Sequence, residues 1–559
     1  MQTRSPSIIP KFIFVTGGVM SGLGKGVVTS SIAKLLQLGG YRVSCIKIDP
    51  YVNYDAGTMN PVAHGEVFVT DDGGECDMDI GNYERFIDRA MTRDHNITTG
   101  RIYMDVIKRE REGKYLGQCV QIIPHVTDAI KDMLKQIAVR EKLDIIVVEC
   151  GGTVGDIESL PFLEALRQMK LELGEGNSLF AHVTLAPSLD VVGEQKTKPT
   201  QHSVQELRRI GIQPDLLAIR CKSPLSPDAA RKISLFASVH QNCVISCHDA
   251  QSIYKVPEIL EQQGTYEVLA GRLGLRKAGL RWGDWKSIAS SFVNSKGSVR
   301  IAVVGKYVTL PDSYVSVSHA LSHAAASMKA KAEIDWIDSE RFENTSGEAA
   351  LSSLASYDGI LVPGGFGARG SEGIIKAANY ACEKDIPYLG ICFGFQLAIV
   401  AYARYRCEMA GANSTELGKT DFPVVDLLPE QREVRELGGT MRLGSHEVFI
   451  KTKSNAERIY ISSKINRRHR HRYEFNRDFE QVLTSAGMVF SAHSDGGRRT
   501  EILEVPANRF YFAVQYHAEF SSRPGKPEQS FAAFVRAAIE RSHFLANSAK
   551  EPMVKDIGV

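Results

Sequence analysis

Short apolar runs recur along this 559-residue chain, and segments with helical periodicity separate them. In the first half of the chain, the runs include residues 11–17, 41–49, 143–152 and 179–186. Continuous apolar strands that alternate with helices are typical of a parallel sheet covered on both faces. The pattern therefore predicts an α/β fold for this half.

The alternation stops at about residue 276, and a polar stretch with two of the three tryptophans continues to residue 299. We predict a linker that contains one helix. A chain of 559 residues also exceeds one ordinary core, because domains average roughly 100–200 residues.

A second α/β unit is predicted after this linker. We expect strands at 299–307, 332–338 and 357–365, with a helix at 316–330. The predicted fold class is thus α/β, with two tandem domains that each contain a mainly parallel sheet flanked by helices. Two polar stretches of the second domain are expected to be loops, at 429–444 and 464–476.

The composition is that of an ordinary globular protein, with 43% hydrophobic and 24% charged residues. A net charge of +2 gives no reason to expect a nucleic acid or a membrane as partner. The ten cysteines are scattered, which favours a reducing compartment. No apolar run reaches the ~18 residues of a membrane span, and the chain starts without a signal-peptide pattern. We expect a cytoplasmic protein.

Residues 16–31, TGGVMSGLGKGVVTSS, look like a phosphate-binding loop that departs from its consensus. The P-loop has Gly, four residues, and then Gly-Lys-Ser/Thr. Here five residues separate Gly18 from Gly24, and Gly26 stands where the magnesium-binding hydroxyl belongs. A strand precedes the loop and a helix is expected after it, so backbone N–H groups would form an anion cradle. We predict a phosphate loop in which Lys25 reaches between phosphates; the alternative is a turn whose glycines serve only tight turning.

A magnesium ion held without that hydroxyl needs other oxygen atoms. Mg²⁺ prefers one or two carboxylates together with phosphate oxygens. The segment 70–86 is rich in carboxylates and includes Asp79, and Glu149 ends an apolar strand where parallel sheets present ligand groups. Asp79 and Glu149 are therefore candidate metal ligands, although either alone could be a cap or a salt-bridge partner.

Several long motifs follow one another in this half of the chain: GGVMSGLGKG, TTGRIY, QIIPHVTDAI, GGTVGDIESLPFLEA and KTKPTQHSV. Together with residues 47–86, they closely resemble the synthetase domain of the CTP synthase family, almost unbroken from residue 11 to about 275. The resemblance implies an ATP-dependent amidoligase domain at 1–275 and a linker at 276–298. It also implies a variant phosphate loop whose metal carboxylates come from elsewhere in the chain.

The resemblance implies roles for several sets of residues. ATP would be bound by Gly22, Leu23, Gly24, Lys25, Gly26, Val27 and Asp79, and Mg²⁺ by Asp79 and Glu149. UTP or CTP would be bound by Ser21, Asp156, Ile157, Glu158, Lys196, Thr197, Lys198, Pro199, Thr200, Gln201 and Lys232. Lys47 would stabilise the transferring phosphoryl group. Most family members have Ser where this chain has Gly22, a replacement that removes a hydroxyl.

Residues 387–403, PYLGICFGFQLAIVAYA, predict a strand, a sharp turn and a helix. Their centre, Gly390 to Gly394, has the form G-x-C-x-G, which parallels the G-x-S-x-G nucleophile elbow. The glycines permit a strained turn that exposes the thiol, and the helix N-terminus that follows favours the thiolate. Backbone N–H groups after the turn are placed to stabilise an oxyanion. Cys392 is therefore a candidate nucleophile.

A thiol nucleophile also needs a base. The segment 512–520, FAVQYHAEF, is strand-like, so His517 and Glu519 are expected on the same face. Glu519 would orient and polarise His517, which would serve Cys392 in acid–base steps. The pattern H-x-E is weak by itself, and its alternative interpretation is a structural histidine.

Residues 299–545 resemble the class I glutamine amidotransferase domain, which leaves a C-terminal tail at 546–559. The segment 361–370, LVPGGFGARG, resembles the second oxyanion strand of that domain. The resemblance implies that glutamine is bound by Gly365, Phe393, Gly394, Phe395, Gln396, Glu416 and Arg472. Phe393 and Phe395 stand where Leu and Met are commoner, and Phe393 is expected to reshape the glutamine pocket.

The two resemblances together imply a glutamine-hydrolysing ligase of pyrimidine nucleotide synthesis. ATP would phosphorylate O4 of UTP, ammonia from glutamine would add at C4, and phosphate would leave to give CTP. The implied cofactor is Mg²⁺. The family also implies inhibition by CTP, activation by GTP that involves residues 429–444, and a homotetramer.

Three other interpretations stay open at this point. Another glutamine-dependent amidoligase, of the cobyrinate-diamide or dethiobiotin type, would share the phosphate loop and thiol elbow but lack KTKPTQHSV and GDIESLPFLEA. A nucleotide-switched binding protein would have no use for the set Cys392, His517 and Glu519. A non-enzymatic assembly protein would be expected to have lost chemical residues that are all present here.

Overall fold

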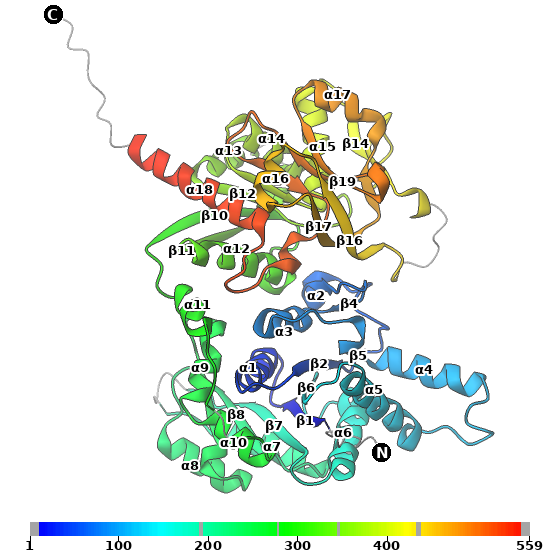
Figure 1. Ribbon diagram of the computed structural model, residues 1–559, viewed down its shortest axis with the longest axis vertical. Helices are drawn as coiled ribbons and strands as arrows, with labels where there is room; N and C mark the ends of the chain where they lie inside the picture. The colour runs from blue at the N-terminus through cyan, green and yellow to red at the C-terminus, as the bar shows by residue number, and fades with distance from the viewer. Residues whose placement is uncertain (1–9, 189–193, 277–278, 344–346, 432–437, 549–559) are drawn as a thin grey trace, which may run out of the picture. The chain divides into compact units, whose positions relative to one another are not determined.

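The computed structural model describes residues 10–188, 194–276, 279–343, 347–431 and 438–548. Its contacts divide the chain into two units, which are described separately (Figure 1). The first unit contains Met1–Ala56 and Cys76–Val293, and the second contains Gly57–Glu75 and Asn294–Val559. A short early segment of the chain thus belongs to the second unit, a feature that the sequence pattern does not indicate.

The first unit is built on a seven-stranded parallel sheet with the order β5-β2-β6-β1-β7-β8-β9. Its strands are β1 (Lys11–Gly17), β2 (Val43–Asp49), β5 (Asn96–Thr98), β6 (Ile145–Cys150), β7 (Ser178–Leu185), β8 (Leu216–Cys221) and β9 (Val244–His248). The four apolar runs of the first half of the sequence are β1, β2, β6 and β7, so their prediction as parallel strands is confirmed.

Helices flank this sheet (Figure 1). They are α1 (Lys25–Leu38), α3 (Asp79–Ile87), α4 (Thr99–Arg111), α5 (Thr127–Arg140), α6 (Leu160–Leu173), α7 (Lys198–Arg209), α8 (Pro227–Ala237), α9 (Val256–Glu261), α10 (Thr265–Arg272) and α11 (Trp285–Ser291). One apolar core joins Phe14, Ile146 and Val148 of the sheet to residues of α5 and α6. Because β1, β2 and β6 are parallel neighbours, the loops that follow them begin at the same edge of the sheet.

The second unit contains a nine-stranded sheet with the order β11-β10-β12-β13-β21-β20-β19-β16-β17. Its strands are β10 (Gly297–Gly305), β11 (Ala330–Asp338), β12 (Gly359–Val362), β13 (Tyr388–Ile391), β16 (Arg442–Ile450), β17 (Lys464–His471), β19 (Val489–Ser494), β20 (Arg499–Glu504) and β21 (Tyr511–Val514). The pairings from β11 to β21 are parallel and those from β21 to β17 are antiparallel. The predicted α/β class is confirmed, while the antiparallel half was not expected.

Smaller elements complete the second unit. They are the strands β3 (Val67–Val69), β14 (Ala412–Ser414), β15 (Phe422–Leu427) and β18 (Tyr473–Phe475), and the helices α2 (Pro61–His64), α12 (Val315–Ser327), α13 (Gly347–Ser352), α14 (Ser371–Glu383), α15 (Phe393–Arg406), α16 (Asn455–Tyr460), α17 (Glu480–Ser485) and α18 (Gln529–Ser548). The chain returns to the first unit within β4 (Glu75–Asp77). The predicted strands and helix at the start of this unit are β10, β11, β12 and α12.

The loop expected at 464–476 is wrong, because these residues form β17 and β18. His469 and His471 of β17 are almost fully buried. The Nε2 atom of His469 lies 2.8 Å from Oε2 of Glu501, and Arg442 donates to Oε1 of Glu501 at 2.8 Å. Hydrogen bonds of polar side chains, rather than apolar side chains, thus accompany the burial of these two histidines, so hydropathy gives no signal for the strand. Of the other expected loop, residues 432–437 lie outside the described residues and β16 begins at Arg442.

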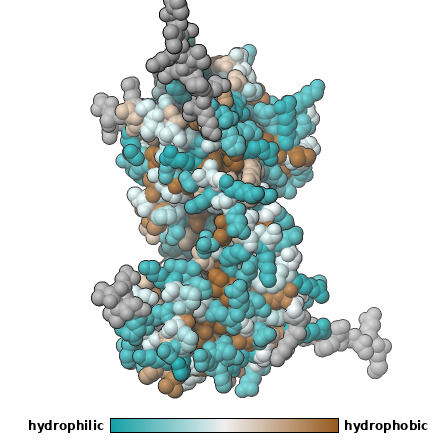
Figure 2. All heavy atoms as spheres, turned by 90° about the vertical axis from the view of Figure 1, so that its left-hand side faces the viewer, coloured by the Kyte–Doolittle hydropathy of each residue, from teal (hydrophilic) through white to brown (hydrophobic). Residues whose placement is uncertain are grey.

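Apolar side chains are mixed with polar ones on the molecular face drawn in Figure 2, where brown residues lie among teal ones. Within the described ranges, no helix has both the length and the apolar character that a bilayer crossing needs. All ten cysteines belong to the described residues, and each is a free thiol.

The variant Glu501→Ala is expected to lower the free energy of unfolding by about 3–5 kcal/mol, because it leaves the buried guanidinium of Arg442 without its carboxylate. The midpoint of denaturant unfolding checks this. The matched control is Glu447→Ala, which removes an exposed ion pair with Lys464 and should cost less than about 1 kcal/mol. Equal losses in the two variants would contradict the role given to the buried pair.

Candidate active sites

The predicted phosphate loop connects β1 to α1 in the first unit. Gly22 and Gly24 have φ angles of 75° and 84°, in the left-handed region that favours glycine. The Nζ atom of Lys25 donates to the carbonyl oxygen of Gly152 at 2.9 Å. The loop is thus a strand–turn–helix connection whose glycines are conformationally required, and its lysine reaches the loop after β6.

Gly26 explains why this loop departs from the P-loop consensus. A Cβ atom built at Gly26 would collide with the side-chain carboxylate of Asp79, the first residue of α3. A serine or threonine at this position would therefore displace the carboxylate of Asp79. The oxygen atoms of Asp79 instead lie beside the first turn of α1, where the consensus hydroxyl would be.

The two predicted metal ligands lie on either side of Lys47, a residue of β2. The Nζ atom of Lys47 contacts Oδ2 of Asp79 and lies 3.1 Å from Oε1 of Glu149. Asp77 and Asp49 are further carboxylates, at 3.8 and 3.9 Å from the same nitrogen atom. The sequence predicted the pair Asp79 and Glu149, and the structure adds two more acids to the cluster.

Four carboxyl groups around Lys47 create an excess of negative charge. Burial raises the pKa of Asp49 to about 6 and that of Asp77 to about 7, and it also raises the pKa of Glu149. Burial acts in the same direction on Asp79, but the charge of Lys47 outweighs it and holds the pKa of Asp79 below its ordinary value. The cluster therefore favours an additional cation.

These carboxylates fit a magnesium ion. No group of three or more His, Cys, Asp or Glu side chains is arranged for metal binding in the ranges that the structure describes. Two carboxylates suffice for Mg²⁺, however, where nucleotide phosphates and water supply the other oxygen atoms. Asp79 and Glu149 are hard oxygen donors in a site with surplus negative charge, so the donor chemistry is that of Mg²⁺.

The residues predicted to bind the pyrimidine nucleotide come from the loop after β1, the loop after β6, the start of α7 and helix α8. Lys198 and Pro199 line a pocket together with Val19 and Thr153. Ser21, Asp156, Ile157, Glu158 and Lys232 are exposed, Lys196 pairs with Glu194 at 2.7 Å, and Thr197, Thr200 and Gln201 are buried in the helix start. Thus part of the predicted set lines a cavity, while the buried members support the backbone that carries it.

A buried histidine, missed in the sequence, joins α7 to β1. His182 of β7 hydrogen-bonds through Nδ1 to Oγ1 of Thr16 at 2.9 Å and through Nε2 to Oγ of Ser203 at 2.7 Å. Burial lowers the pKa of His182 to about 3, so its ring is neutral. A Cβ atom at Gly18 would collide with Ser203, which shows how closely the loop and α7 approach each other.

The predicted thiol elbow lies between β13 and α15 of the second unit. Cys392 has a φ angle of 51° and a ψ angle of −95°, a strained backbone for a residue other than glycine. A Cβ atom at Gly390 would lie 2.7 Å from the carbonyl oxygen of Gly394, and one at Gly394 would collide with the carbonyl oxygen of Val362. Both glycines are therefore sterically required, and the sharp turn predicted from G-x-C-x-G is confirmed.

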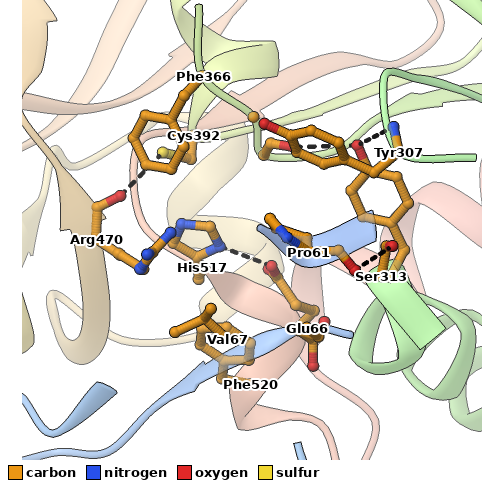
Figure 3. A pocket seen from close by; sticks show the side chains of 14 residues that line it. Pro61, Glu66, Val67, Tyr307, Ser313, Phe366, Cys392, Arg470, His517 and Phe520 are labelled. Atoms are coloured by element: carbon orange, nitrogen blue, oxygen red, sulfur yellow. Dashed lines mark hydrogen bonds and ion pairs between the residues drawn. The ribbon is translucent and has the colours of Figure 1, made fainter. Parts of the chain in front are cut away.

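Cys392, His517 and Glu519 line one pocket (Figure 3). The Nδ1 atom of His517 lies 2.7 Å from Oε1 of Glu519, whereas its Nε2 atom is buried without a hydrogen-bond partner among the described residues. Burial acts to lower the pKa of His517, but the negative charges of Glu519 and Cys392 outweigh it and raise the pKa to about 10. The geometry places an imidazolium in the same pocket as the sulfur atom of Cys392.

His517 and Glu519 are paired, but the strand predicted to place them on the same face ends before them. Strand β21 ends at Val514, and a short 3₁₀ helix, Ala518–Ser521, carries Glu519. A tight turn therefore brings His517 and Glu519 together, and the alternation of a strand does not. Gly364 closes the other side, because a Cβ atom there would lie 2.8 Å from Cε1 of His517.

The predicted glutamine-binding residues separate into three groups. Gly365 lines the pocket, and Glu416 accepts a hydrogen bond from the backbone N–H of Gly367 at 2.7 Å. Phe393, Gly394, Phe395 and Gln396 are buried in the first turn of α15. Arg472 donates to Gln431 at 2.5 Å and to Thr440 at 3.0 Å.

Other lining residues were missed in the sequence. Arg470 and Phe366 line the pocket, and so do Pro61, Glu66 and Val67 of the early segment (Figure 3). Arg470 lies in a stretch that was expected to be a loop, and nothing local marks the early segment as part of this unit. Lys306, also unforeseen, is buried and donates to the carbonyl oxygen of Phe366 at 2.8 Å, and burial lowers its pKa to about 8.

Two family models match the chain. The model described as "CTP synthase N-terminus" matches residues 11–275, and the model "Glutamine amidotransferase class-I" matches residues 309–537.

Curated relatives match over nearly the whole chain. The chain is 55% identical to a CTP synthase of Pyrococcus abyssi over 95% of its own length and 98% of that protein. It is 53% identical to a CTP synthase of Archaeoglobus fulgidus over 95% and 98% of the two chains. Among solved structures, the glutaminase domain of a Trypanosoma brucei CTPS with bound acivicin is 37% identical, with a TM-score of 0.41, and covers 43% of this chain and 94% of that one.

The variant Gly26→Ser restores the P-loop consensus, yet it is expected to weaken ATP binding by at least about tenfold, because its side chain would collide with Asp79. Isothermal titration calorimetry with ATP and Mg²⁺ checks this. In the control Gly271→Ser, a Cβ atom in α10 meets nothing within 4 Å, so ATP affinity should be unchanged. Unchanged or tighter binding by Gly26→Ser would show that Asp79 does not exclude the hydroxyl.

Proposed function

The chain belongs to the CTP synthase family, so it is an ATP-dependent ligase that aminates UTP to CTP with nitrogen from glutamine, and we propose which of its residues perform each part of that reaction. One observation carries the proposal most directly. Cys392, His517 and Glu519 surround one pocket, with His517 paired to Glu519 at 2.7 Å. Neither a nucleotide switch nor an assembly protein would need this set.

In the proposed glutaminase reaction, the thiolate of Cys392 attacks the side-chain amide carbon of glutamine. Backbone N–H groups at Gly365 and Phe393 stabilise the oxyanion that forms. His517, protonated because Glu519 stabilises its positive charge, gives a proton to the departing ammonia. Water then hydrolyses the glutamyl thioester, and the thiol and glutamate are released.

The amino-acid group of glutamine is assigned to Glu416 and Arg472. Burial raises the pKa of Glu416, and its contact with the N–H of Gly367 places it next to the loop that contains Gly365. Phe393, Gly394, Phe395 and Gln396 shape the elbow and the start of α15 behind the thiol. In this proposal they act through the backbone that they position.

In the proposed ligase reaction, Lys25 and the amides of residues 22–27 hold the phosphates of ATP. Asp79 and Glu149 would hold Mg²⁺, which supplies positive charge against the phosphates when it is bound. Lys47 stabilises the phosphoryl group as it passes to O4 of UTP. Ammonia then adds at C4, and phosphate leaves from the same carbon to give CTP.

UTP is assigned to residues of the phosphate loop, the loop after β6, the start of α7 and helix α8: Ser21, Asp156, Ile157, Glu158, Lys196, Thr197, Lys198, Pro199, Thr200, Gln201 and Lys232. The pocket lined by Lys198 and Pro199 supports this assignment. Family membership alone supports the remaining proposals, namely feedback inhibition by CTP, activation by GTP, a homotetramer, a cytoplasmic location and the domain limits 1–275 and 299–545.

The variant Cys392→Ala is expected to lose glutamine-dependent CTP formation by at least about 10³-fold, because the acceptor for the glutamyl group is gone. CTP formation from ammonium should stay within about twofold of wild type. Steady-state assays with UTP, ATP and Mg²⁺, with each nitrogen source in turn, test both statements. If the wild type forms no CTP from either source, the assignment of UTP as acceptor is wrong.

The variant Glu519→Gln is expected to move the alkaline limb of the glutaminase pH profile to lower pH by at least about one unit. Glu519 raises the pKa of His517 to about 10, so removing its charge lowers that pKa, and the imidazolium is lost at a lower pH as the pH rises. The pH dependence of kcat/KM for glutamine checks this. An unmoved alkaline limb would contradict it, and the ammonium-dependent profile serves as the control.

A further inference from the structure

Residues 57–75 are anchored in the second unit at both ends. At one end, Pro61 accepts a hydrogen bond from the hydroxyl of Ser313 at 2.9 Å, and the buried carboxylate of Glu66 accepts from both the backbone N–H and the hydroxyl of Ser316. At the other end, Nε of Arg470 donates to Glu75 at 2.7 Å. The segment is therefore held by buried polar contacts and not only by exposed ones.

Strand β3 of this segment places a phenylalanine in an aromatic column. The ring of Phe68 is buried, with its centroid 4.8 Å from that of Phe520. The guanidinium of Arg468 lies 5.3 Å from the ring centre of Phe68, and its Nε atom donates to Asp71 at 2.6 Å. Phe68 is thus enclosed between a cation fixed by its own segment and the ring of Phe520.

The column ends on the proposed catalytic histidine. The rings of Phe520 and His517 are stacked, with centroids 5.2 Å apart and an interplanar angle of 15°. The backbone N–H of His517 also donates to the carbonyl oxygen of Arg468 at 2.8 Å. Arg468 therefore supports His517 through the backbone and, by way of Phe68 and Phe520, through the face of its ring.

The imidazole of His517 is fixed from three sides. Glu519 holds Nδ1, and Gly364 lies against Cε1. Phe520 covers the ring face. The contacts with Glu519 and Gly364 act on the edge of the ring, so the packing of Phe520 on its face determines the tilt of the ring. Figure 3 shows Val67, the neighbour of Phe68, next to Phe520 and below His517, with the ribbon of the early segment in blue.

We propose that Phe68 is a positioning residue of the glutaminase: by filling the space behind Phe520, it sets the tilt of His517 toward Cys392. The early segment thus completes an active site whose reacting groups all lie more than 300 residues later in the sequence. This inference rests on the proposed role of His517. It assigns Phe68 no contact with glutamine.

The test compares Phe68→Ala with wild type in the full-length protein. Glutamine-dependent kcat should fall about three- to tenfold, while KM for glutamine changes less than about twofold, because an aromatic contact behind the base is lost and not one to substrate. The alkaline limb of the kcat/KM profile should also move, since the position of His517 relative to Glu519 and Cys392 sets its pKa. Ammonium-dependent CTP formation should stay within about twofold of wild type.

Two further variants separate positioning from general stability. Phe68→Leu keeps most of the volume behind Phe520 and should restore more than half of the lost kcat. Phe490→Ala removes an equally buried ring of the same unit, one that stacks on Phe475 away from the pocket, and should leave the pH profile unchanged.

The inference is overturned if Phe68→Ala retains the wild-type kcat and pH profile with glutamine, or if Phe490→Ala changes both to the same extent. A wild-type protein that does not hydrolyse glutamine would instead refute the proposed function. The two failures are therefore distinguishable.

Discussion

A charged side chain is stable inside a protein only where an opposite charge meets it, and this constraint shapes both units. In the first unit, Lys47 lies among carboxylates that burial alone would neutralise. In the second unit, the buried carboxylate of Glu501 meets the guanidinium of Arg442 and hydrogen-bonds to the buried ring of His469 in strand β17. Both units therefore contain buried ion pairs whose members come from distant parts of the sequence, and the surrounding fold has to keep those members together.

Features with a local cause could be predicted from the sequence. The apolar runs of the first sheet are strands because nearly every residue of such a run is buried, and β1 occupies the expected residues. The turn at Cys392 was predictable because Gly390 and Gly394 face each other across that turn. The long motifs of the CTP synthase family identified the first half for the same reason, since they preserve loops and helix starts as continuous stretches, and the thiol elbow did so for the class I glutamine amidotransferase half.

Features that depend on distant partners could not be predicted in this way. Strand β17 lacks an apolar face, and its burial depends on Glu501, 32 residues beyond His469. The pairing of His517 with Glu519 was expected for the wrong reason, because a 3₁₀ turn resembles a strand in its polar pattern. Gly26 departs from the phosphate-loop consensus because the distant residue Asp79 occupies the space of its side chain.

The end of the early segment links residues of the two units along the backbone. Within the three residues of β4, Glu75 pairs with Arg470 of the second unit, and Asp77 lies 3.8 Å from Lys47 of the first. Successive strand residues have a fixed spacing of about 3.3 Å, so a shift of β4 by one position would break both pairs. The two units are thus joined by a short strand as well as by the later connection between Val293 and Asn294. An insertion in β4 would disturb both ion pairs, whereas the connection between Val293 and Asn294 contributes no residue to either pair.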